Sequence, residues 1–265
     1  MAESEIRFED GAAYERMMGI WSGLAGAVFI DWLKPDKGLR WIDVGCGNGA
    51  FSEQLVDRCA PAEIQGIDPS QGQIDFARKR PAARLAKFGI GNAMALPFAD
   101  NSFDAATMAL VIFFVPEPKK GVAEMARVVR PGGTVAAYAW DILGGGFPQE
   151  PLRIELRAMG IDPINPPSAE AARIDAMRDL WRGAGLEAVE TREITVQRTF
   201  ADFEDYWEVT LLAASVAPTL GTMSPADRDR LKEKLRARAG GCLGTHHLQR
   251  PCQCREGPRA GLMLF

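Results

Sequence analysis

The sequence is short of several features that would settle its class at once. None of its apolar runs approaches the length that crosses a bilayer, and its first ten residues, MAESEIRFED, lack the basic and apolar regions of a signal peptide. It has no basic block and no run that mixes basic with aromatic residues, and its net charge is -4. We therefore expect a cytoplasmic protein whose partners include neither a membrane nor a nucleic acid.

Cysteine and histidine are scarce as well, with five and two residues respectively. Cys46 and Cys59 are far apart in the chain, and we interpret both as buried thiols rather than as a disulfide or metal ligands. The remaining candidate metal ligands are Cys242, His246, His247, Cys252 and Cys254. Their spacing matches no common zinc site, so we predict no metal, with a zinc cluster in the tail as the open alternative.

What is present points to one large core. The chain has 265 residues, of which 47% are hydrophobic and 25% charged, enough to bury a single core of ordinary size. Strand patterns alternate with helical ones, and the strands are expected at 40–44, 63–68, 84–91, 103–112 and 134–140. This alternation predicts an α/β fold, a Rossmann-like doubly wound and mostly parallel sheet flanked by helices, with a ligand crevice at its switch point.

The segment WIDVGCGNGA, residues 41–50, is the most informative part of the chain. An apolar strand runs into Asp43 and is followed by Gly45, Gly47 and Gly49, which permit a tight turn and the close approach of a ligand. A helix that begins at this turn would direct free N–H groups and a positive dipole at a carboxylate or phosphate. The segment therefore predicts a nucleoside cofactor.

The glycine turn alone leaves the identity of that cofactor open. Gly45, Gly47 and Ala50 also satisfy the dinucleotide pattern G-x-G-x-x-G/A, and Asp68 ends the next strand as that pattern requires. A hydride-transfer site would also need an acid, but no Tyr-x-x-x-Lys pair follows the fourth or fifth strand and both histidines are close to the C-terminus. An NAD(P)-binding oxidoreductase is therefore the weaker alternative.

Four segments, taken in order, resemble the class I S-adenosylmethionine-dependent methyltransferases that act on small molecules. They are WIDVGCGNG (41–49), IQGIDPS (64–70), GNAMALPFADNSFDAATMALVIFFVPEP (91–118) and RVVRPGGTVAAYAWD (127–141). The resemblance covers roughly residues 10–240, and the combination is more specific than any one segment. It implies S-adenosylmethionine as cofactor and methyl transfer to a small-molecule acceptor, which the sequence does not identify; the oligomeric state also stays open.

The resemblance also implies how the cofactor would be held. Asp43 and the glycine turn would surround its methionine half, and Asp68 would accept both ribose hydroxyls, because an ionised carboxylate offers only acceptors. Asn92 would accept from the adenine amine, at a position where relatives more often have Asp. The cofactor-binding residues expected are Asp43, Gly45, Cys46, Gly47, Gly49, Asp68, Pro69, Gln73, Asn92, Ala93 and Leu110.

Two further expectations concern the surroundings of the cofactor. Ser70 is expected to cap a helix that starts after Pro69, with Gln73 completing a capping box. The apolar residues 96–98 either line the adenine or belong to the core.

Two regions outside the sheet are expected to shape the acceptor site. The segment YERMMGIW, residues 14–21, resembles the N-terminal lid of the family, whose aromatic residues would face the positive sulfonium; an amphipathic helix packed on the core is the alternative. The glycine- and proline-rich stretch 141–167 is typical of a binding loop. The substrate and lid candidates are Met18, Trp21, Trp140 and Tyr206, although the aromatic stripe around the last is more typical of a core.

Methyl transfer is an in-line displacement at an activated carbon, so an enzyme mainly orients the reactants and excludes water. A general base is optional. If one is used, Asp141 just after the fifth strand is our first candidate, and the Tyr14 hydroxyl could orient the acceptor. A protein that binds the cofactor without turnover is the alternative from another functional class.

We expect one methyltransferase domain in four parts: an N-terminal lid with helices (1–38), the cofactor-binding core (39–141), a substrate-side region with cap helices (142–240) and an atypical tail (241–265). Relatives tend to end in a strand resembling IxYSARANAVKGR beside the fifth strand. The degenerate codons for residues 246–259, read one nucleotide later, can encode IIYSARANAVKGR. We therefore hypothesise a frameshift upstream, a lost or altered last strand, and a poorly ordered tail.

Overall fold

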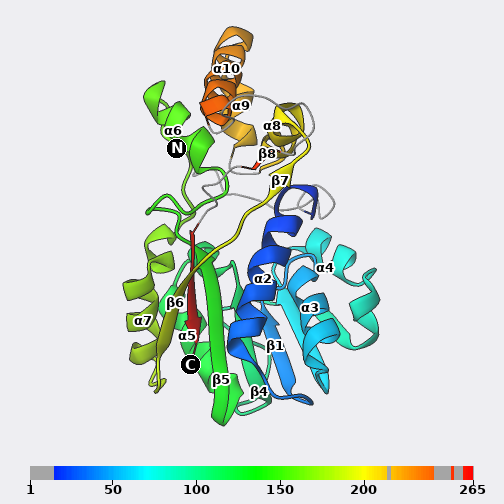
Figure 1. The fold of residues 1–265 in the computed structure, drawn as a ribbon. Coiled ribbons are helices and arrows are strands. Elements are labelled where there is room, and N and C mark those ends of the chain that lie inside the picture. The colour runs from blue at the N-terminus through cyan, green and yellow to red at the C-terminus, as the bar shows by residue number, and fades with distance from the viewer. Residues whose placement is uncertain (1–14, 214–215, 242–251, 254–258, 265) are drawn as a thin grey trace.

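The computed structural model describes residues 15–213, 216–241, 252–253 and 259–264, and its centre is a seven-stranded sheet (Figure 1). In spatial order the strands are β3 (Ala86–Ile90), β2 (Glu63–Asp68), β1 (Arg40–Val44), β4 (Phe103–Ala109), β5 (Val129–Trp140), β9 (Arg259–Leu264) and β6 (Glu190–Thr195). The first five strands are parallel, whereas β9 is antiparallel to both of its neighbours. The predicted doubly wound, mostly parallel α/β sheet is confirmed.

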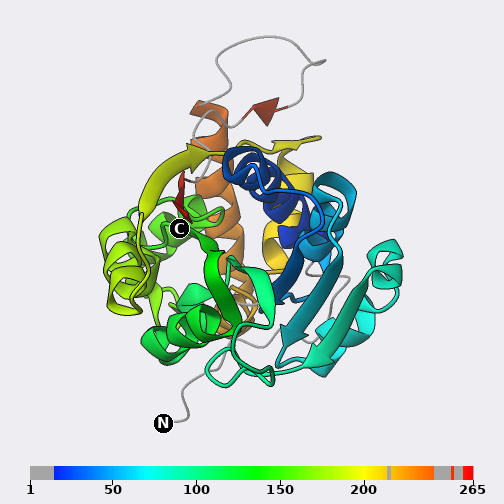
Figure 2. The ribbon, with the colours of Figure 1, turned by 90° about the horizontal axis from the view of Figure 1, so that it is seen from below.

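Helices cover both sides of this sheet, as Figures 1 and 2 show. They are α2 (Ile20–Leu33), α3 (Ala50–Cys59), α4 (Gln71–Ala77), α5 (Pro118–Val128) and α7 (Ile174–Gly183). Because both faces are covered, β1 is a nearly continuous apolar run, and its Trp41, Ile42 and Val44 are fully buried. The helix α4 begins as predicted, with the Ser70 hydroxyl accepting a hydrogen bond from the Gln73 N–H.

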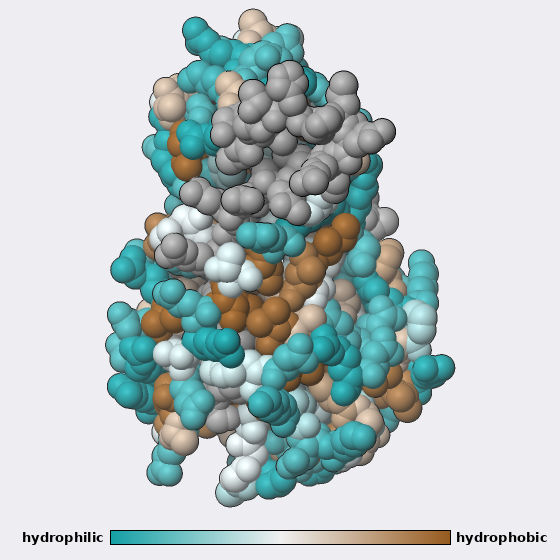
Figure 3. Space-filling view, in the orientation of Figure 1, coloured by the Kyte–Doolittle hydropathy of each residue, from teal (hydrophilic) through white to brown (hydrophobic). Residues whose placement is uncertain are grey.

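A second group of helices forms a cap above the carboxyl ends of the parallel strands (Figure 1). The cap helices are α6 (Glu150–Ala158), α8 (Phe203–Leu211), α9 (Ala217–Thr222) and α10 (Pro225–Gly241). A short ladder pairs β7 (Thr199–Phe200) with β8 (Cys252–Gln253). Hydrophobic residues gather on this face of the molecule between the sheet layer and the cap (Figure 3). Within the described ranges, no helix has both the length and the apolar character needed to span a bilayer.

Local backbone geometry explains where the elements depart from the predicted bounds. The fourth strand ends at Ala109 instead of 112, because Leu110 has a left-handed φ of 61° and Ile112–Phe114 forms a 3-10 turn. The third strand starts late because Pro81–Arg84 forms another 3-10 turn. A 3-10 turn, Ala169–Ala172, precedes α7.

Of the two expectations for the last strand beside β5, loss is wrong, whereas an altered strand is compatible with the structure. In the structure β9 lies there, pairing its Leu262 with Tyr138 of β5 on one side and with Arg192 of β6 on the other. The sequence RAGLML is small and apolar enough for an inner strand, and its pairing satisfies backbone groups of both neighbours. Residues 242–251 and 254–258 lie outside the described part, and the frameshift remains a hypothesis about the gene.

Candidate cofactor and acceptor site

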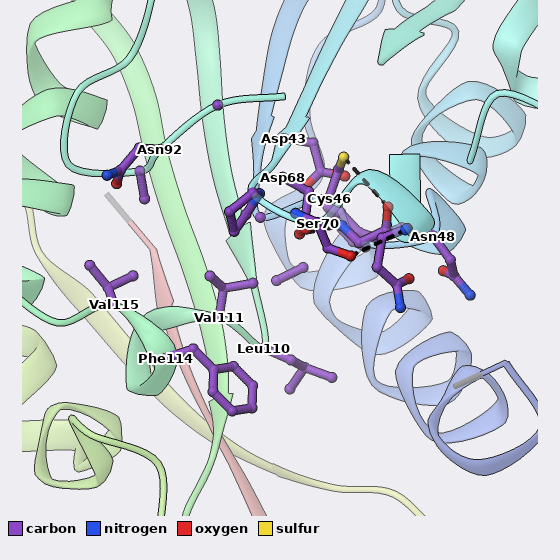
Figure 4. Close-up of a pocket in the computed structure, with 18 of the residues that line it drawn as sticks. Asp43, Cys46, Asn48, Asp68, Ser70, Asn92, Leu110, Val111, Phe114 and Val115 are labelled. Atoms are coloured by element: carbon purple, nitrogen blue, oxygen red, sulfur yellow. Dashed lines mark hydrogen bonds between the residues drawn. The ribbon is translucent and has the colours of Figure 1, made fainter. Parts of the chain in front are cut away.

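A cavity of about 1600 Å³ opens at the carboxyl ends of β1, β2 and β4, where the order of strands reverses (Figure 4). Its volume exceeds that of most pockets for a single small ligand, so it has room for a cofactor and a second molecule. Figure 4 shows two kinds of wall: polar residues around the glycine turn, including Asp43 and Asp68, and apolar residues that follow β4.

The glycine turn has a geometry that side chains would disturb. Gly45, Gly47 and Gly49 all have positive φ, at 74°, 52° and 80°. A Cβ on Gly45 would lie only 2.5 Å from a methyl carbon of Val111. The N–H groups of Gly45 and Cys46 donate to the Ile67 carbonyl of β2, at 2.8 and 2.9 Å. The turn is therefore fastened to the sheet while its other side faces the cavity.

Asp68 is the last residue of β2 and faces the same cavity. Its carboxylate accepts hydrogen bonds from the backbone N–H of Gly47, at 3.1 Å, and of Ser70, at 2.8 Å. Burial raises the pKa of this carboxyl, while the two N–H donors oppose that shift because they favour the ionised form. With two oxygens and several lone pairs, the carboxylate can still accept from a diol.

Asp43 is a fully buried carboxyl on the cavity wall. One of its oxygens accepts a 2.6 Å hydrogen bond from the Ser52 hydroxyl, and the other has no hydrogen-bond partner among the described residues. Burial raises the pKa of Asp43 to about 7, and the nearby Asp68 adds to this rise. A buried acid with one unmatched oxygen is suited to a cationic ligand group, such as an ammonium.

The adenine end of the predicted site is only partly arranged as expected. Asn92 and Ala93 line the cavity, as does Leu110. The Asn92 side-chain oxygen already accepts a hydrogen bond from the Met94 N–H, at 2.9 Å, which leaves it one lone pair for an adenine amine. The stretch 96–98 does not line the cavity; Leu96 is buried, which supports the core alternative.

Most of the predicted cofactor residues converge on this one cavity. Those that line it are Asp43, Gly45, Cys46, Gly47, Asp68, Pro69, Gln73, Asn92, Ala93 and Leu110. The exception is Gly49, which is the N-cap of α3 and does not line the cavity. Residues predicted from separate motifs thus come together at the carboxyl ends of four strands, β1, β2, β3 and β4.

The opposite wall was not predicted residue by residue. It consists of residues that follow β4 and of a cap loop, namely Val111, Phe114, Val115, Pro116, Ile164, Asn165 and Pro167. The cap loop is fastened at both ends: Arg153 donates to the Ile164 carbonyl at 3.1 Å and to Asn165, and Ser168 donates to the Val115 carbonyl at 2.7 Å. The glycine and proline content of 141–167 had indicated a binding loop, and its end does line the cavity.

The four substrate and lid candidates do not line the cavity. Met18 and Trp21 are buried, and Trp21 packs edge-on against the equally buried Trp140, with ring centroids 6.4 Å apart. Tyr206 packs against Phe200, with a centroid distance of 5.2 Å. These positions match the core alternative, because large rings at the junction of the sheet and the cap remove apolar surface from water.

The catalytic candidate Asp141 does not line the cavity either. Asp141 lies in a tight turn, where its side chain accepts a hydrogen bond from the Gly144 N–H at 2.9 Å. Tyr14 lies outside the described residues. Of the possible zinc ligands, Cys242, His246, His247 and Cys254 also lie outside them, and no group of three potential metal ligands occurs within the described ranges.

Known proteins match the chain over its cofactor core. Residues 42–137 match the family model described as a methyltransferase domain. The demethylmenaquinone methyltransferase of Renibacterium salmoninarum is 45% identical over 118 residues, covering 43% of this chain and 48% of that protein. The ubiquinone/menaquinone biosynthesis C-methyltransferase of Roseobacter denitrificans is 38% identical over 118 residues, covering 43% and 47%. The match thus spans about half the length of these curated relatives.

Solved structures extend the likeness to most of the chain. A putative methyltransferase from an antibiotic biosynthesis pathway of Anabaena variabilis has a TM-score of 0.63 at 20% identity, covering 90% of this chain and 95% of that one. The YcgJ protein of Bacillus subtilis has a TM-score of 0.59 at 17% identity, covering 91% and 96%. At such identities the likeness shows the fold, which is the Rossmann-like fold of class I methyltransferases, and residues 42–137 of the chain match the methyltransferase domain.

Proposed function

We propose that this protein transfers the methyl group of S-adenosylmethionine to a small-molecule acceptor. The observation that carries the proposal is a pair of carboxyls, the fully buried Asp43 and the partly buried Asp68, set around one glycine turn on a single cavity. The unmatched oxygen of Asp43 suits the ammonium of the methionine half, and Asp68 suits the ribose diol. A cofactor seated there would supply a methyl group activated by its sulfonium.

In the methyl-transfer step the residues of the chain would bind, orient and shield the reactants rather than exchange protons with the acceptor. Gly45 and Gly47 allow the cofactor to approach the backbone, because neither has a Cβ. Asn92 and Ala93 would hold the adenine through an amide and a backbone N–H. The apolar wall after β4 and the cap loop would keep water from the methyl group and align the acceptor with it.

The wall opposite the glycine turn supports an acceptor with an apolar body. Phe114, Val115 and Ile164 present hydrocarbon to the cavity, and Asn165 adds a polar group at its rim. The names of the relatives refer to demethylmenaquinone and to ubiquinone/menaquinone biosynthesis. Reduced quinones are therefore the first acceptors to try in a panel that also includes phenols and amines.

Calorimetric titration with S-adenosylhomocysteine, beside NAD, tests the cofactor assignment. We expect saturable binding to the wild type, and a Kd raised at least about thirtyfold in Asp68→Ala, since hydrogen bonds to a charged group contribute about 2 kcal/mol or more. Asp75→Ala is the matched control, because Asp75 is an exposed carboxylate on the helix that follows. Preference for NAD, or equal affinities in Asp68→Ala and wild type, would contradict the proposal.

A methyl-transfer assay with the acceptor panel then tests turnover. Formation of S-adenosylhomocysteine that depends on one acceptor and is lost together with cofactor binding in Asp68→Ala would support an enzyme. Tight cofactor binding with no transfer to any member of a broad panel would favour the alternative of a binding protein.

A further inference from the structure

The π-helical turn η1 (Glu15–Gly19), which leads directly into α2, is held on two sides. Turns of this type are rare and occur often at functional sites. One side of η1 meets the glycine turn of the cofactor cavity, and the other meets the segment between the sheet and the cap helix α8.

On the first side, Arg80 joins three segments through one guanidinium. It donates to the backbone carbonyl of Asn48 at 2.6 Å, to Glu53 of α3 at 2.8 Å, and to the carboxylate of Glu15. Asn48 lies inside the glycine turn, is 2% exposed, and donates its side-chain N–H to the same Glu15 oxygen at 2.7 Å. Glu15 therefore binds both the turn and the arginine that supports the turn.

Within the Glu15–Arg80 pair the arginine is shielded from water, whereas the Glu15 side chain is 41% exposed. The Arg80 side chain is 13% exposed and stacks on Phe76, with 5.4 Å from the guanidinium to the ring centroid. Charge-assisted hydrogen bonds that are partly shielded from water are stronger than surface ion pairs. Gly19 leaves space for the folded-back carboxylate, since a Cβ there would lie 2.7 Å from the carboxyl carbon of Glu15.

On the second side, η1 is tied to the segment that leads into the cap. The buried Arg198 donates to the carbonyl of Met17 at 2.9 Å and stacks on Phe200, 4.5 Å from its ring centroid. Arg16 pairs with Glu208 of α8 at 3.1 Å. The turn η1 is therefore a physical link between the glycine turn and a cap helix, two parts that lie far apart in the sequence.

We propose that Glu15 and Arg80 are positioning residues that latch η1 onto the cofactor turn, so that cofactor binding and the docking of the cap segment stabilise each other. The inference rests on the proposed function, because its ligand is the same cofactor. A ligand that orders the glycine turn strengthens the Asn48–Glu15–Arg80 contacts, and these hold η1 against Arg198. By linkage, a firmly docked η1 increases affinity for the cofactor by the same factor.

The test compares Glu15→Gln and Gly19→Ala with the wild type, using S-adenosylhomocysteine as the probe. Glu15→Gln keeps size but removes charge, and Gly19→Ala displaces the carboxylate without changing charge. We expect each variant to raise the Kd about five- to twentyfold, within the usual range of such coupling. In the wild type, the probe should also slow amide hydrogen exchange in residues 196–211, and this slowing should be lost in both variants.

The control is the double variant Asp31→Asn, Arg58→Gln. It removes a 2.6 Å ion pair that joins α2 to α3 and contacts neither η1 nor the glycine turn. Its Kd should stay within about twofold of the wild type. A fall in melting temperature with an unchanged Kd in Glu15→Gln and Gly19→Ala would show a purely structural role and overturn the latch. Absence of probe binding to the wild type would instead overturn the proposed function, and the latch with it.

Discussion

The buried carboxyl of Asp43 should make the stability of the empty protein fall as the pH rises. Its pKa in the folded protein is about 7, against 3.8 for the free group, so the folded state retains a proton that the unfolded state has already lost. Between about pH 4 and about pH 7 the unfolded state therefore gains stability relative to the folded state, by about 1.4 kcal/mol per pH unit. Above about pH 7 the full penalty, about 4 kcal/mol, is present.

Asp43→Asn isolates this contribution, because the variant shares every other titrating group. The amide oxygen can still accept from Ser52, so the variant keeps the 2.6 Å contact of the wild type. We expect the free energy of unfolding of the wild type, minus that of the variant, to fall by about 3 kcal/mol between about pH 5 and about pH 8. Urea unfolding across this range measures it, and parallel curves for the two proteins would refute the reasoning.

The same carboxyl should couple cofactor binding to proton release. An ammonium placed against the unmatched oxygen of Asp43 favours the ionised form, so binding below about pH 7 should expel a proton that Asp43 holds in the empty site. Calorimetry of S-adenosylhomocysteine binding in buffers with different ionisation enthalpies counts those protons. The release should disappear in Asp43→Asn; equal release in both proteins would place the proton elsewhere.

Three further predictions concern single substitutions. Gly45→Ala should lose about 2 kcal/mol of stability and most cofactor affinity, because the φ of Gly45 is 74° and the new Cβ would meet Val111. Urea unfolding measures the stability and calorimetry the affinity. Unchanged values would mean that the turn relaxes without cost. Asp141→Asn should retain turnover within about twofold of the wild type, because the Asp141 carboxylate accepts a hydrogen bond within its own turn. A loss of about a hundredfold would instead indicate that Asp141 is the general base. Arg153→Met should raise the KM for the acceptor and leave the Kd of S-adenosylhomocysteine unchanged, because Arg153 donates a hydrogen bond to Asn165 of the cap loop. An equal change in both constants would contradict a role of Arg153 on the acceptor side alone.

The convergence of the glycine turn, Asp43 and Asp68 on one cavity could be predicted because the signals are local. In WIDVGCGNGA, strand residues, an acid and positive-φ glycines occur within ten positions, and the bounds predicted for β1 and β2 agree with the structure. The carboxyl ends of neighbouring parallel strands must lie together, so Asp43 and Asp68 converge once the sheet order is known. The family resemblance added the chemistry, since the same glycine turn also fits a dinucleotide.

Aromatic residues could not be assigned from their local pattern. Trp21 and Trp140 were expected at the acceptor site, yet they pack against each other in the interior, edge to face. Whether a ring faces a ligand or another ring depends on which distant segment covers it. That choice is made by packing, which a periodic pattern does not encode.

The amino-acid sequence by itself indicated the parallel strands, the glycine turn and the carboxyls that suit a nucleoside cofactor, because each of these signals depends on neighbours within a few residues. Only the tertiary structure decided that Ile164 and Asn165 form the opposite wall, that Glu15 meets Asn48 and Arg80, and that Arg259–Leu264 lies between β5 and β6. These contacts join residues that are tens to hundreds of positions apart. Their partners are selected by shape, by burial and by the need to pair backbone groups in the assembled fold.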